Sequence, residues 1–335
     1  MSAEPGVGER PGVSERSGVR DTPGMKAASG AIAAHAVGDP GKGPSANTAG
    51  PRRATLSVIL ITKNEADNID ACLDSVAFAD EIIVVDSGST DATRDIAAAR
   101  GARVVLTEDW PGFGPQKNRA LELAGGEWVL SIDADERVTP ELAREIQSIL
   151  DSDRRAAPFT AAATATPGPS ASSVYSGAAT AVSGDMPCAY RIARLSNFGG
   201  RWIRHSGWWP DHVLRLFRRG TARFKDVAVH ESVVTDRPVG TLKGHFLHYP
   251  YASLEHYIAK INHYSSEAAA MMHARGKRTS VLGAWGHATW TFVRIYLLRK
   301  GFLDGREGFI LAMMGAAGSF FRYTKLLFLN RRQPK

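Results

Sequence analysis

The chain has 335 residues, of which 44% are hydrophobic and 22% are charged, and it contains two cysteines, Cys72 and Cys188. This length and composition suit a folded, water-compatible chain with one large domain or two small ones. Two widely separated cysteines exclude a disulfide framework and a cysteine-based zinc site, and they favour a reducing compartment.

The net charge of +7 is unevenly distributed along the chain. Residues 275–335 contain twelve Lys and Arg against two acidic residues, a net charge of +10, which leaves −3 for the rest of the chain. A mildly acidic body with a basic C-terminal tail indicates that the tail has a role of its own.

Two segments lack the periodicity of regular secondary structure. Residues 1–53 are rich in Gly, Ala, Pro and Ser, and we expect them to form a disordered N-terminal arm. This arm lacks the basic start and the continuous apolar run of a signal peptide. Residues 151–187 are also of low complexity, which predicts a mobile insertion.

Between these segments, short apolar runs alternate with helical patterns. Runs that are apolar on both faces are typical of buried strands, and their alternation with helices indicates an α/β fold with a parallel sheet covered on two sides. The sequence predicts strands at 56–62, 81–87, 102–107 and 127–133, and helices within 64–76, 90–102 and 114–124. Thr139 and Pro140 then match the start of a further helix.

Polar side chains follow each predicted strand, at the edge where ligands bind in an open parallel sheet. Asp133 and Asp135 follow the fourth strand and project to the same side of an extended backbone. Two crowded carboxylates repel each other unless a cation lies between them, and oxygen ligands with room for water and phosphate suit Mg²⁺ or Mn²⁺. The alternative is a solvated turn before a helix, because Asp favours turns.

The motifs LSVILITKNEADNI, IIVVDSGSTDAT and QKNRALELAGGEWVLSIDADE resemble the nucleotide-sugar half of a family 2 glycosyltransferase. With GWWPDHVLRLFRRG, VHESV and LKGHFLHYPY, the resemblance extends to about Tyr251, and it is strongest to the bacterial lipopolysaccharide inner-core β-glucosyltransferases. It implies a GT-A (Rossmann-like) domain with a mainly parallel sheet over 54–252, followed by a basic region of amphipathic helices over 253–335.

The resemblance also implies a nucleotide-sugar site at this sheet edge. Its matching residues are Thr62, Asn64, Glu65, Asp86, Lys117, Arg119 and Asp133. Asp86 matches the family's uracil contact, Lys117 and Arg119 its basic contacts, and Asp133 its ribose and metal contact. Asp135 matches the direct metal ligand, so that the acids would hold Mg²⁺ or Mn²⁺ on the nucleotide diphosphate. Lys117 and Arg119 have an alternative role on a solvated helix face.

The catalytic base departs from the family pattern. Inversion at the anomeric carbon needs a carboxylate that takes the acceptor proton, and many members use the Asp of a Glu-Asp pair. At the matching place stands WWPDHVLRLF, so we predict Asp211 as the base, with Glu231 as the alternative. Trp208 and Trp209 then form a sugar-facing wall or pack in the core.

A histidine from GHFLHYPY completes the predicted metal site. The family resemblance favours His248 as this ligand, because it directly precedes the tyrosine-rich end of the motif. The alternative is that His248 is a packed, hydrogen-bonded residue without a metal.

The C-terminal region contains apolar stretches that are interrupted by charge. The longest charge-free piece of the second apolar stretch, residues 308–321, is shorter than the roughly 20 residues needed to span a bilayer. Aromatic residues flanked by Arg and Lys favour helices that lie on an anionic membrane surface. The alternatives are a helical pair that packs on the catalytic domain, and a nucleic-acid partner, for which no recognition motif is present.

These features predict an inverting hexosyltransferase at the cytoplasmic face of the inner membrane, bound there as a peripheral or monotopic protein. It would move a hexose, with glucose favoured, from a UDP-sugar to a lipid-linked acceptor such as heptose of the lipopolysaccharide inner core. The alternatives are a polyprenyl-linked or other surface glycan as acceptor, nucleotidyl transfer on a similar sheet, and a non-enzymatic membrane scaffold.

Overall fold

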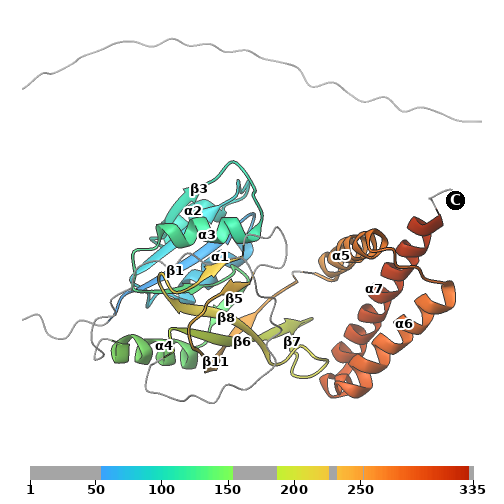
Figure 1. Cartoon of the computed structure of the whole chain (residues 1–335). Helices are drawn as coiled ribbons and strands as arrows, with labels where there is room; N and C mark the ends of the chain where they lie inside the picture. The colour runs from blue at the N-terminus through green and yellow to red at the C-terminus, as the bar shows by residue number, and fades with distance from the viewer. Residues whose placement is uncertain (1–53, 154–186, 226–231, 252, 332–335) are drawn as a thin grey trace, which may run out of the picture. The chain divides into compact units, whose positions relative to one another are not determined.

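The computed structural model describes residues 54–153, 187–225, 232–251 and 253–331 (Figure 1). The predicted N-terminal arm lies outside the described residues, as does 154–186 of the predicted insertion. Residues 151–153, which we expected to belong to the insertion, instead form the last turn of α4 (Pro140–Asp153). Asp153 is tied to the sheet, because Trp128 Nε1 donates to its Oδ2 over 2.9 Å and Arg218 forms an ion pair with it.

The first half of the chain forms the predicted parallel sheet. Strands β1 (Leu56–Thr62), β2 (Glu81–Asp86), β3 (Arg103–Leu106) and β4 (Trp128–Ser131) pair in parallel in the order β3-β2-β1-β4. The connecting helices are α1 (Ala66–Ser75), α2 (Thr93–Ala99) and α3 (Phe113–Leu123). Gly101 has a φ of +79°, which glycine adopts readily after a helix end, as the sequence predicts.

Both faces of this sheet are buried, as the continuous apolar runs indicate. Successive residues of a strand point to opposite faces. Val58 and Leu60 of β1 therefore pack with Ile69 of α1 in one cluster, whereas Ile59 packs with Ala120 of α3 in another. The α/β prediction is confirmed for this half of the domain.

The second half makes the sheet mixed. After β4 the order continues β8 (Asp211–Arg218), β6 (Ala189–Phe198), β11 (Val239–His248) and β5 (Glu136–Val138). β8 runs antiparallel to β4 and to β6, β11 runs antiparallel to β5, and β6 and β11 are parallel. The short strands β7 (Arg201–Trp202), β9 (Arg223–Phe224) and β10 (Val233–Val234) lie off this path.

The register of the second half gathers charged residues at one place. β11 pairs with β5 so that His248 lies opposite Glu136, and with β6 so that His248 lies beside Ser196. β6 pairs with β8 so that Arg194 lies opposite Asp211. Residues far apart in the sequence therefore meet where β4 also delivers Asp133 and Asp135.

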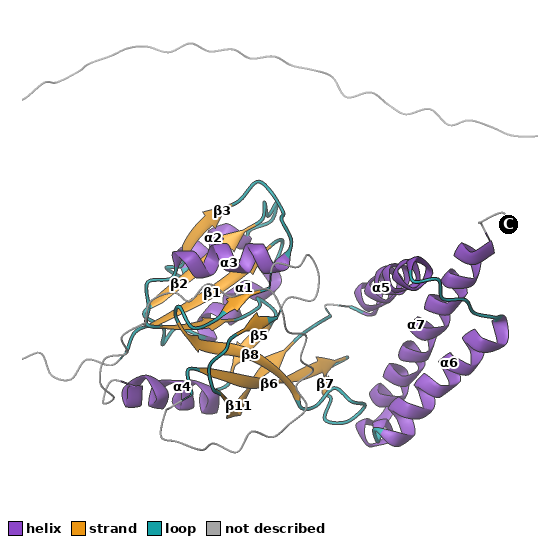
Figure 2. Cartoon of the chain, viewed as in Figure 1, coloured by secondary structure: helices purple, strands orange, loops and turns teal. Residues whose placement is uncertain are grey.

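The C-terminal region is helical, as predicted (Figure 2). It contains α5 (Leu254–Ala274), α6 (Val281–Val293), the π-helical turn η1 (Arg294–Leu298), the 3₁₀ turn η2 (Gly301–Asp304) and α7 (Gly305–Arg331). Ser253 and Ser280 cap α5 and α6 by accepting backbone N–H bonds. Among the residues that the structure describes, no helix is both long enough and apolar enough to cross a membrane.

Candidate active site

The loop after β2 is built around a fully buried carboxylate. Asp86 Oδ1 accepts from the backbone N–H groups of Gly88 (3.1 Å) and Ser89 (2.7 Å), and Oδ2 accepts from the hydroxyls of Ser89 (2.5 Å) and Thr62 (2.8 Å). The structure thus brings Thr62 and Asp86 together, as the family resemblance implies. Here Asp86 fixes the shape of its own loop at the carboxyl edge of the sheet.

The loop after β1 lies against the same turn. Asn64 has a φ of +57°, its backbone N–H donates to Ser89 Oγ over 2.8 Å, and its side-chain oxygen accepts from the Thr90 N–H over 2.8 Å. Burial raises the pKa of the neighbouring Glu65 carboxyl, and the negative charge of Asp135 raises it further, against a hydrogen bond from Asn68. The loop after β1 therefore lies near Asp133 and Asp135.

Asp133 is held between two buried cations. Lys117 Nζ donates to its Oδ1 over 2.9 Å, and Arg215 donates to its Oδ2. Burial alone would raise the pKa of Asp133, but the charges of Arg215 and Lys117 outweigh this and hold the pKa well below its usual range. Glu136 Oε2 accepts from the Asp133 backbone N–H over 3.0 Å, so Glu136 braces this loop.

The two cations and Asp133 line a pocket of about 380 Å³, together with Arg194 and Phe224. Lys117 is 3% exposed, and its ammonium lies 5.7 Å from the centre of the Phe224 ring. The lining contains three cationic side chains and one carboxylate, and Glu136 pairs with Arg194 and Arg215 from outside the lining. The excess of positive charge in the lining suits an anionic ligand such as a diphosphate.

Asp135 and His248 form a second pair beside this pocket. His248 Nε2 lies 3.5 Å from Asp135 Oδ2, and His248 Nδ1 lies 2.9 Å from Ser196 Oγ. A hydrogen bond at one ring nitrogen orients the ring and leaves the other nitrogen directed at Asp135, as is usual for a metal-binding histidine.

A divalent cation fits this donor set only in part. Asp135 and His248 offer an oxygen and a nitrogen, and Mg²⁺ commonly takes few protein ligands and completes its shell with water and substrate phosphates. Asp133 already holds two cationic side chains. Within the described residues, no group of three or more His, Cys, Asp or Glu lies close enough to bind a metal by itself. A cation at Asp135 and His248 would therefore need further oxygen ligands, from water or from a bound phosphate.

Asp211 lines a separate pocket of about 270 Å³, which His248, Trp208 and Tyr251 also line. Arg194 donates through Nε to Asp211 Oδ2 over 2.9 Å, and its Nη1 lies 3.5 Å from Glu136 Oε1. The side chain of Asp211 is 45% exposed. The predicted base and the predicted histidine ligand therefore share one cavity.

The two predicted sugar-facing tryptophans differ in position. Trp208 lines the pocket and also packs against Phe198 and Tyr251, with ring centroids 6.0 Å and 6.2 Å apart, so it belongs both to the wall and to a small apolar cluster. Trp209 is not part of this lining and packs edge to face against His245 at 5.5 Å.

One other predicted site residue, Arg119, lies apart from this arrangement. Arg119 of α3 forms an exposed, bidentate ion pair with Asp109, in which both hydrogen bonds measure 2.7 Å. Glu231, the alternative base, lies outside the described residues.

Sequence reasoning missed Arg194 and Arg215. A signal for both was present, because each is a charged residue within an otherwise apolar strand motif, RIARL or VLRLF. Buried charges are almost always paired, so a strand arginine that faces the interior predicts a carboxylate nearby.

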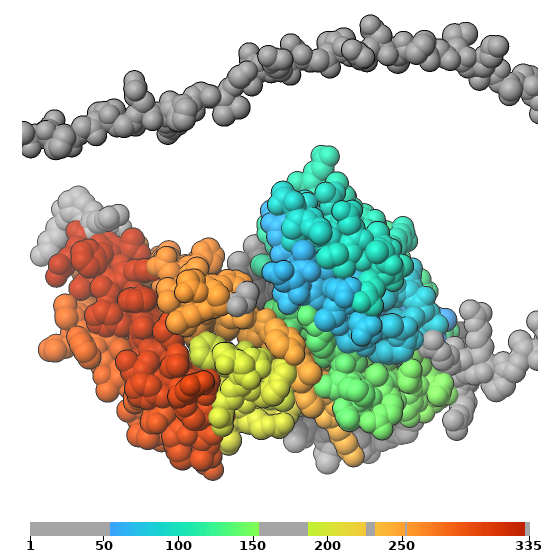
Figure 3. Space-filling view, turned by 180° about the vertical axis from the view of Figure 1, so that it is seen from behind, coloured from blue at the N-terminus to red at the C-terminus, as the bar shows by residue number. Residues whose placement is uncertain are grey.

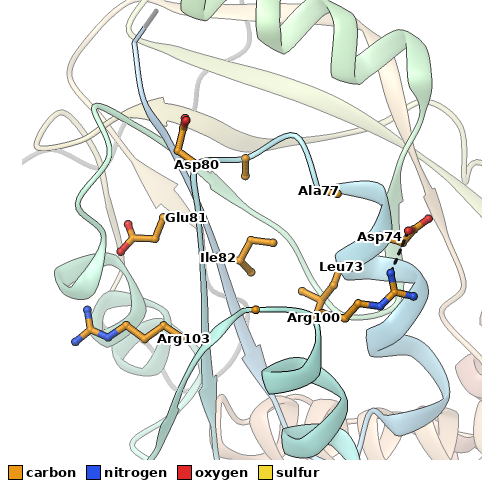
Figure 4. Close-up of a pocket in the computed structure, with 10 residues that line it drawn as sticks. Leu73, Asp74, Ala77, Asp80, Glu81, Ile82, Arg100 and Arg103 are labelled. Carbon is orange, nitrogen blue, oxygen red and sulfur yellow. Dashed lines mark hydrogen bonds and ion pairs between the residues drawn. The ribbon is translucent and has the colours of Figure 1, made fainter.

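A different pocket of about 400 Å³ lies at the opposite edge of the sheet, beside Glu81 at the start of β2 (Figure 4). The acidic side chains of this pocket connect elements of the fold. Asp80 accepts from the Leu56 N–H over 2.8 Å, and Glu81 accepts from Ser57 Oγ over 2.6 Å. Asp74 forms an ion pair with Arg100. Ligands of open α/β sheets bind at the carboxyl edge, so this pocket is not the candidate site.

Known proteins match the sequence of this chain. The profile of "Glycosyl transferase family 2" matches residues 57–169. An "Uncharacterized glycosyltransferase" of Rickettsia bellii (strain RML369-C) is 32% identical over 288 residues, which cover 81% of this chain and 85% of the relative. The "Lipopolysaccharide core biosynthesis glycosyltransferase LpsC" of Rhizobium meliloti (strain 1021) is 29% identical over 282 residues, which cover 81% and 91%.

A solved structure of glucosyl-3-phosphoglycerate synthase from Mycobacterium tuberculosis, in complex with Mn²⁺, UDP and glucosyl-3-phosphoglycerate, is 39% identical over the aligned part. The alignment covers 25% of this chain and 34% of that chain, with a TM-score of 0.23. On the strength of the profile match and the relatives that cover most of its length, this chain belongs to glycosyltransferase family 2 and has a GT-A-like fold.

Proposed function

We propose that this glycosyltransferase moves a hexose, with glucose favoured, from a UDP-sugar to a lipid-linked acceptor, with inversion at the anomeric carbon. The proposed acceptor is heptose of the lipopolysaccharide inner core. The observation that carries the proposal is one cavity shared by Asp211 and His248, next to the cationic pocket of Lys117 and Arg215. The likeness to a relative named for lipopolysaccharide core biosynthesis supports the acceptor class.

The donor would bind across the two pockets. The loops of Thr62, Asn64 and Asp86 form the nucleotide end, and the cationic pocket receives the diphosphate. Lys117 and Arg215 are positioned in advance by Asp133, so they need little reorganisation when negative charge develops on the leaving diphosphate.

Asp135 and His248 would hold Mg²⁺ or Mn²⁺, with Asp133 beside them. When bound, this cation adds positive charge that stabilises the leaving diphosphate. Ser196 keeps the His248 ring in place, and the backbone oxygen of Asp135 accepts from the Tyr249 N–H over 2.8 Å. These contacts fix the His248 ring and the backbone at Asp135 before substrate arrives.

Asp211 would take the proton from the acceptor hydroxyl as that oxygen attacks the anomeric carbon. Both bonds from Arg194 reach the same oxygen, Oδ2. Within the described residues, Oδ1 therefore keeps its lone pairs for the hydroxyl proton. Trp208 and Tyr251 supply aromatic surfaces on which a sugar ring packs.

The proposed location is the cytoplasmic face of the inner membrane, with the protein bound as a peripheral or monotopic protein. Large apolar side chains on α6, η1 and η2 are exposed, and the exposed basic residues Arg294, Arg299 and Lys300 lie in or beside these elements, which suits an anionic lipid surface. The C-terminal helices form the orange and red part of the surface in Figure 3. A lipid-linked acceptor would then be presented at the same surface.

The experiment that tests this function is a panel of nucleotide-sugars, offered to the purified protein with Mn²⁺ or Mg²⁺ and extracted lipopolysaccharide that ends in heptose. We expect UDP to be released from UDP-glucose and the lipid to gain one hexose. Asp211→Asn should release far less UDP while it still binds the nucleotide, because only the base is changed. Transfer to polyprenyl-linked lipid alone would correct the acceptor, whereas release of pyrophosphate would replace the proposal with nucleotidyl transfer.

A further inference from the structure

A buried aspartate in the C-terminal region contacts the segment that leads into the cavity of Asp211 and His248. We call this cavity the acceptor pocket, after its role in the proposed function. Asp304, at the end of η2, is 2% exposed. Its Oδ1 accepts from the Arg204 N–H over 3.1 Å, and its Oδ2 accepts from the His205 N–H over 3.1 Å and from Ser206 Oγ over 2.8 Å. His205 Nδ1 also lies 3.1 Å from Oδ1. A buried carboxylate with this many donors fixes the backbone that supplies them.

The segment that Asp304 holds runs directly into the pocket. Residues 204–206 precede Trp208 and Asp211, both of which line the cavity of about 270 Å³. The backbone N–H of Ser206 also donates to the Arg299 carbonyl over 2.9 Å. At Gly207, φ is +81° and an added Cβ would lie 2.1 Å from the Arg299 side chain. The chain before Asp211 is thus fixed from the C-terminal side.

Two further contacts join the same helices to the pocket. Tyr257 of α5 and Leu311 of α7 pack with Phe198 and Ile203 in one buried cluster, and Trp208 lies against it. Lys260 of α5 donates to the Pro250 carbonyl over 3.1 Å, and Pro250 is part of the pocket lining. The C-terminal helices therefore form the support of the acceptor side, beyond any contact that they make with lipid.

We propose that Asp304 is a positioning residue for acceptor transfer: it holds residues 204–206 so that Trp208 and Asp211 face the pocket. This inference rests on the proposed function of that pocket. Asp304 contacts none of the donor-side residues Thr62, Asp86 or Lys117 through a hydrogen bond or ion pair found in the described residues. Its loss should therefore weaken acceptor transfer and leave donor binding intact.

The first test is hydrogen–deuterium exchange on the full chain, with Asp304→Ala, Asp304→Asn and the control Glu307→Gln. Glu307 is a buried acid one turn further along, but its carboxylate pairs with Arg306, whose side chain is 87% exposed. We expect faster exchange in 203–211 for Asp304→Ala and a smaller increase for Asp304→Asn, whose side chain keeps one acceptor oxygen. Unchanged exchange in Asp304→Ala would show that the contacts of Asp304 do not fix residues 204–206.

The second test separates positioning from general stability. For Asp304→Ala we expect transfer from UDP-glucose to heptose-terminated lipopolysaccharide to fall about tenfold to a hundredfold, the cost of misplaced reacting groups. The dissociation constant of UDP should stay within a factor of about two, because this change is remote from the donor site. Asp304→Asn should recover part of the transfer rate, and Glu307→Gln should match the wild type.

Equal losses of UDP binding and transfer would overturn the positioning role and leave Asp304 as a stabilising residue only. If the wild type transfers no sugar to any lipid, the proposed function fails. The exchange experiment then still decides whether Asp304 fixes the segment, so the two failures are distinguishable.

Discussion

At the scale of single residues, the site depends on how Asp133 is neutralised. Lys117 and Arg215 are nearly buried and each holds one carboxylate oxygen. Removal of one partner of a buried ion pair leaves an uncompensated charge, which costs more than the pair itself contributes. The three residues therefore behave as a unit with one net positive charge, as the proposed binding of a diphosphate requires.

Lys117→Met and Arg119→Met should differ clearly. Lys117→Met removes a bond to a buried carboxylate, and we expect about 1.5–3 kcal/mol lower stability and a weaker affinity for UDP. Arg119→Met breaks the exposed pair with Asp109 and a hydrogen bond to Gln116 Oε1, and we expect a clearly smaller loss of stability because solvent screens the pair. Urea unfolding and calorimetric titration with UDP measure both, with Arg100→Met at the opposite sheet edge as the control. Equal effects of the first two substitutions would contradict this assignment.

The sequence alone could not separate Lys117 from Arg119. Both lie on α3, and residues two apart on a helix face different directions, but only the tertiary structure decides which direction is the site. The pairing of Asp135 with His248 could be expected from the family motifs, whereas the Ser196 contact depends on the pairing of β6 with β11.

At the scale of elements, the two halves of the sheet differ in how far local sequence determines them. β1, β2 and β4 are apolar on both faces, so they were predictable from composition and length. β5 has three residues and pairs only through β11, and β6 contains arginines whose partners come from other strands. Their pairing is set by tertiary contacts, which no local pattern encodes.

The contact between β11 and α4 can be tested at Gly244. A Cβ at this position would lie 2.5 Å from the Cα of Leu142 at the start of α4, so backbone would have to shift. We expect Gly244→Ala to lower the free energy of unfolding by about 1–3 kcal/mol. Gly286→Ala, at a helical position with open space around it, is the matched control and should raise stability by about 0.5–1 kcal/mol. Urea unfolding that gave the two variants equal stability would exclude a tight contact here.

At the scale of the whole molecule, the C-terminal helices carry an apolar surface bordered by positive charge. Leu282, Trp285, Trp290 and Leu298 are 83%, 61%, 56% and 62% exposed. Arg294, Arg299 and Lys300 are exposed in the same region. A simple deletion of these helices would be a poor test of membrane binding. It would also remove Tyr257, Leu311 and Asp304, which contact residues next to the proposed acceptor pocket.

Surface substitutions avoid this difficulty. The full chain should sediment with vesicles of phosphatidylethanolamine and phosphatidylglycerol. The double variant Trp285→Ser, Trp290→Ser should bind these vesicles at least about tenfold more weakly. The reason is that each aromatic side chain buried in the lipid contributes about 1.5–3 kcal/mol to binding. Trp110→Ser, which changes a 48% exposed tryptophan in the β3–α3 loop, is the control and should bind as the wild type does. A wild type that stays in solution and elutes as a dimer would show that the surface binds a second copy instead.

The central claim is that Asp135, with His248, holds a divalent cation where a UDP-sugar gives up its sugar. The most direct measurement is Mn²⁺-dependent release of UDP from the donor by the wild type and by Asp135→Asn, with the folded state of each confirmed by its unfolding transition. The account predicts a loss of about a hundredfold to a thousandfold in the variant, as for other preorganised charges at a leaving group. An Asp135→Asn protein that releases UDP at the wild-type rate with the same Mn²⁺ dependence would contradict it.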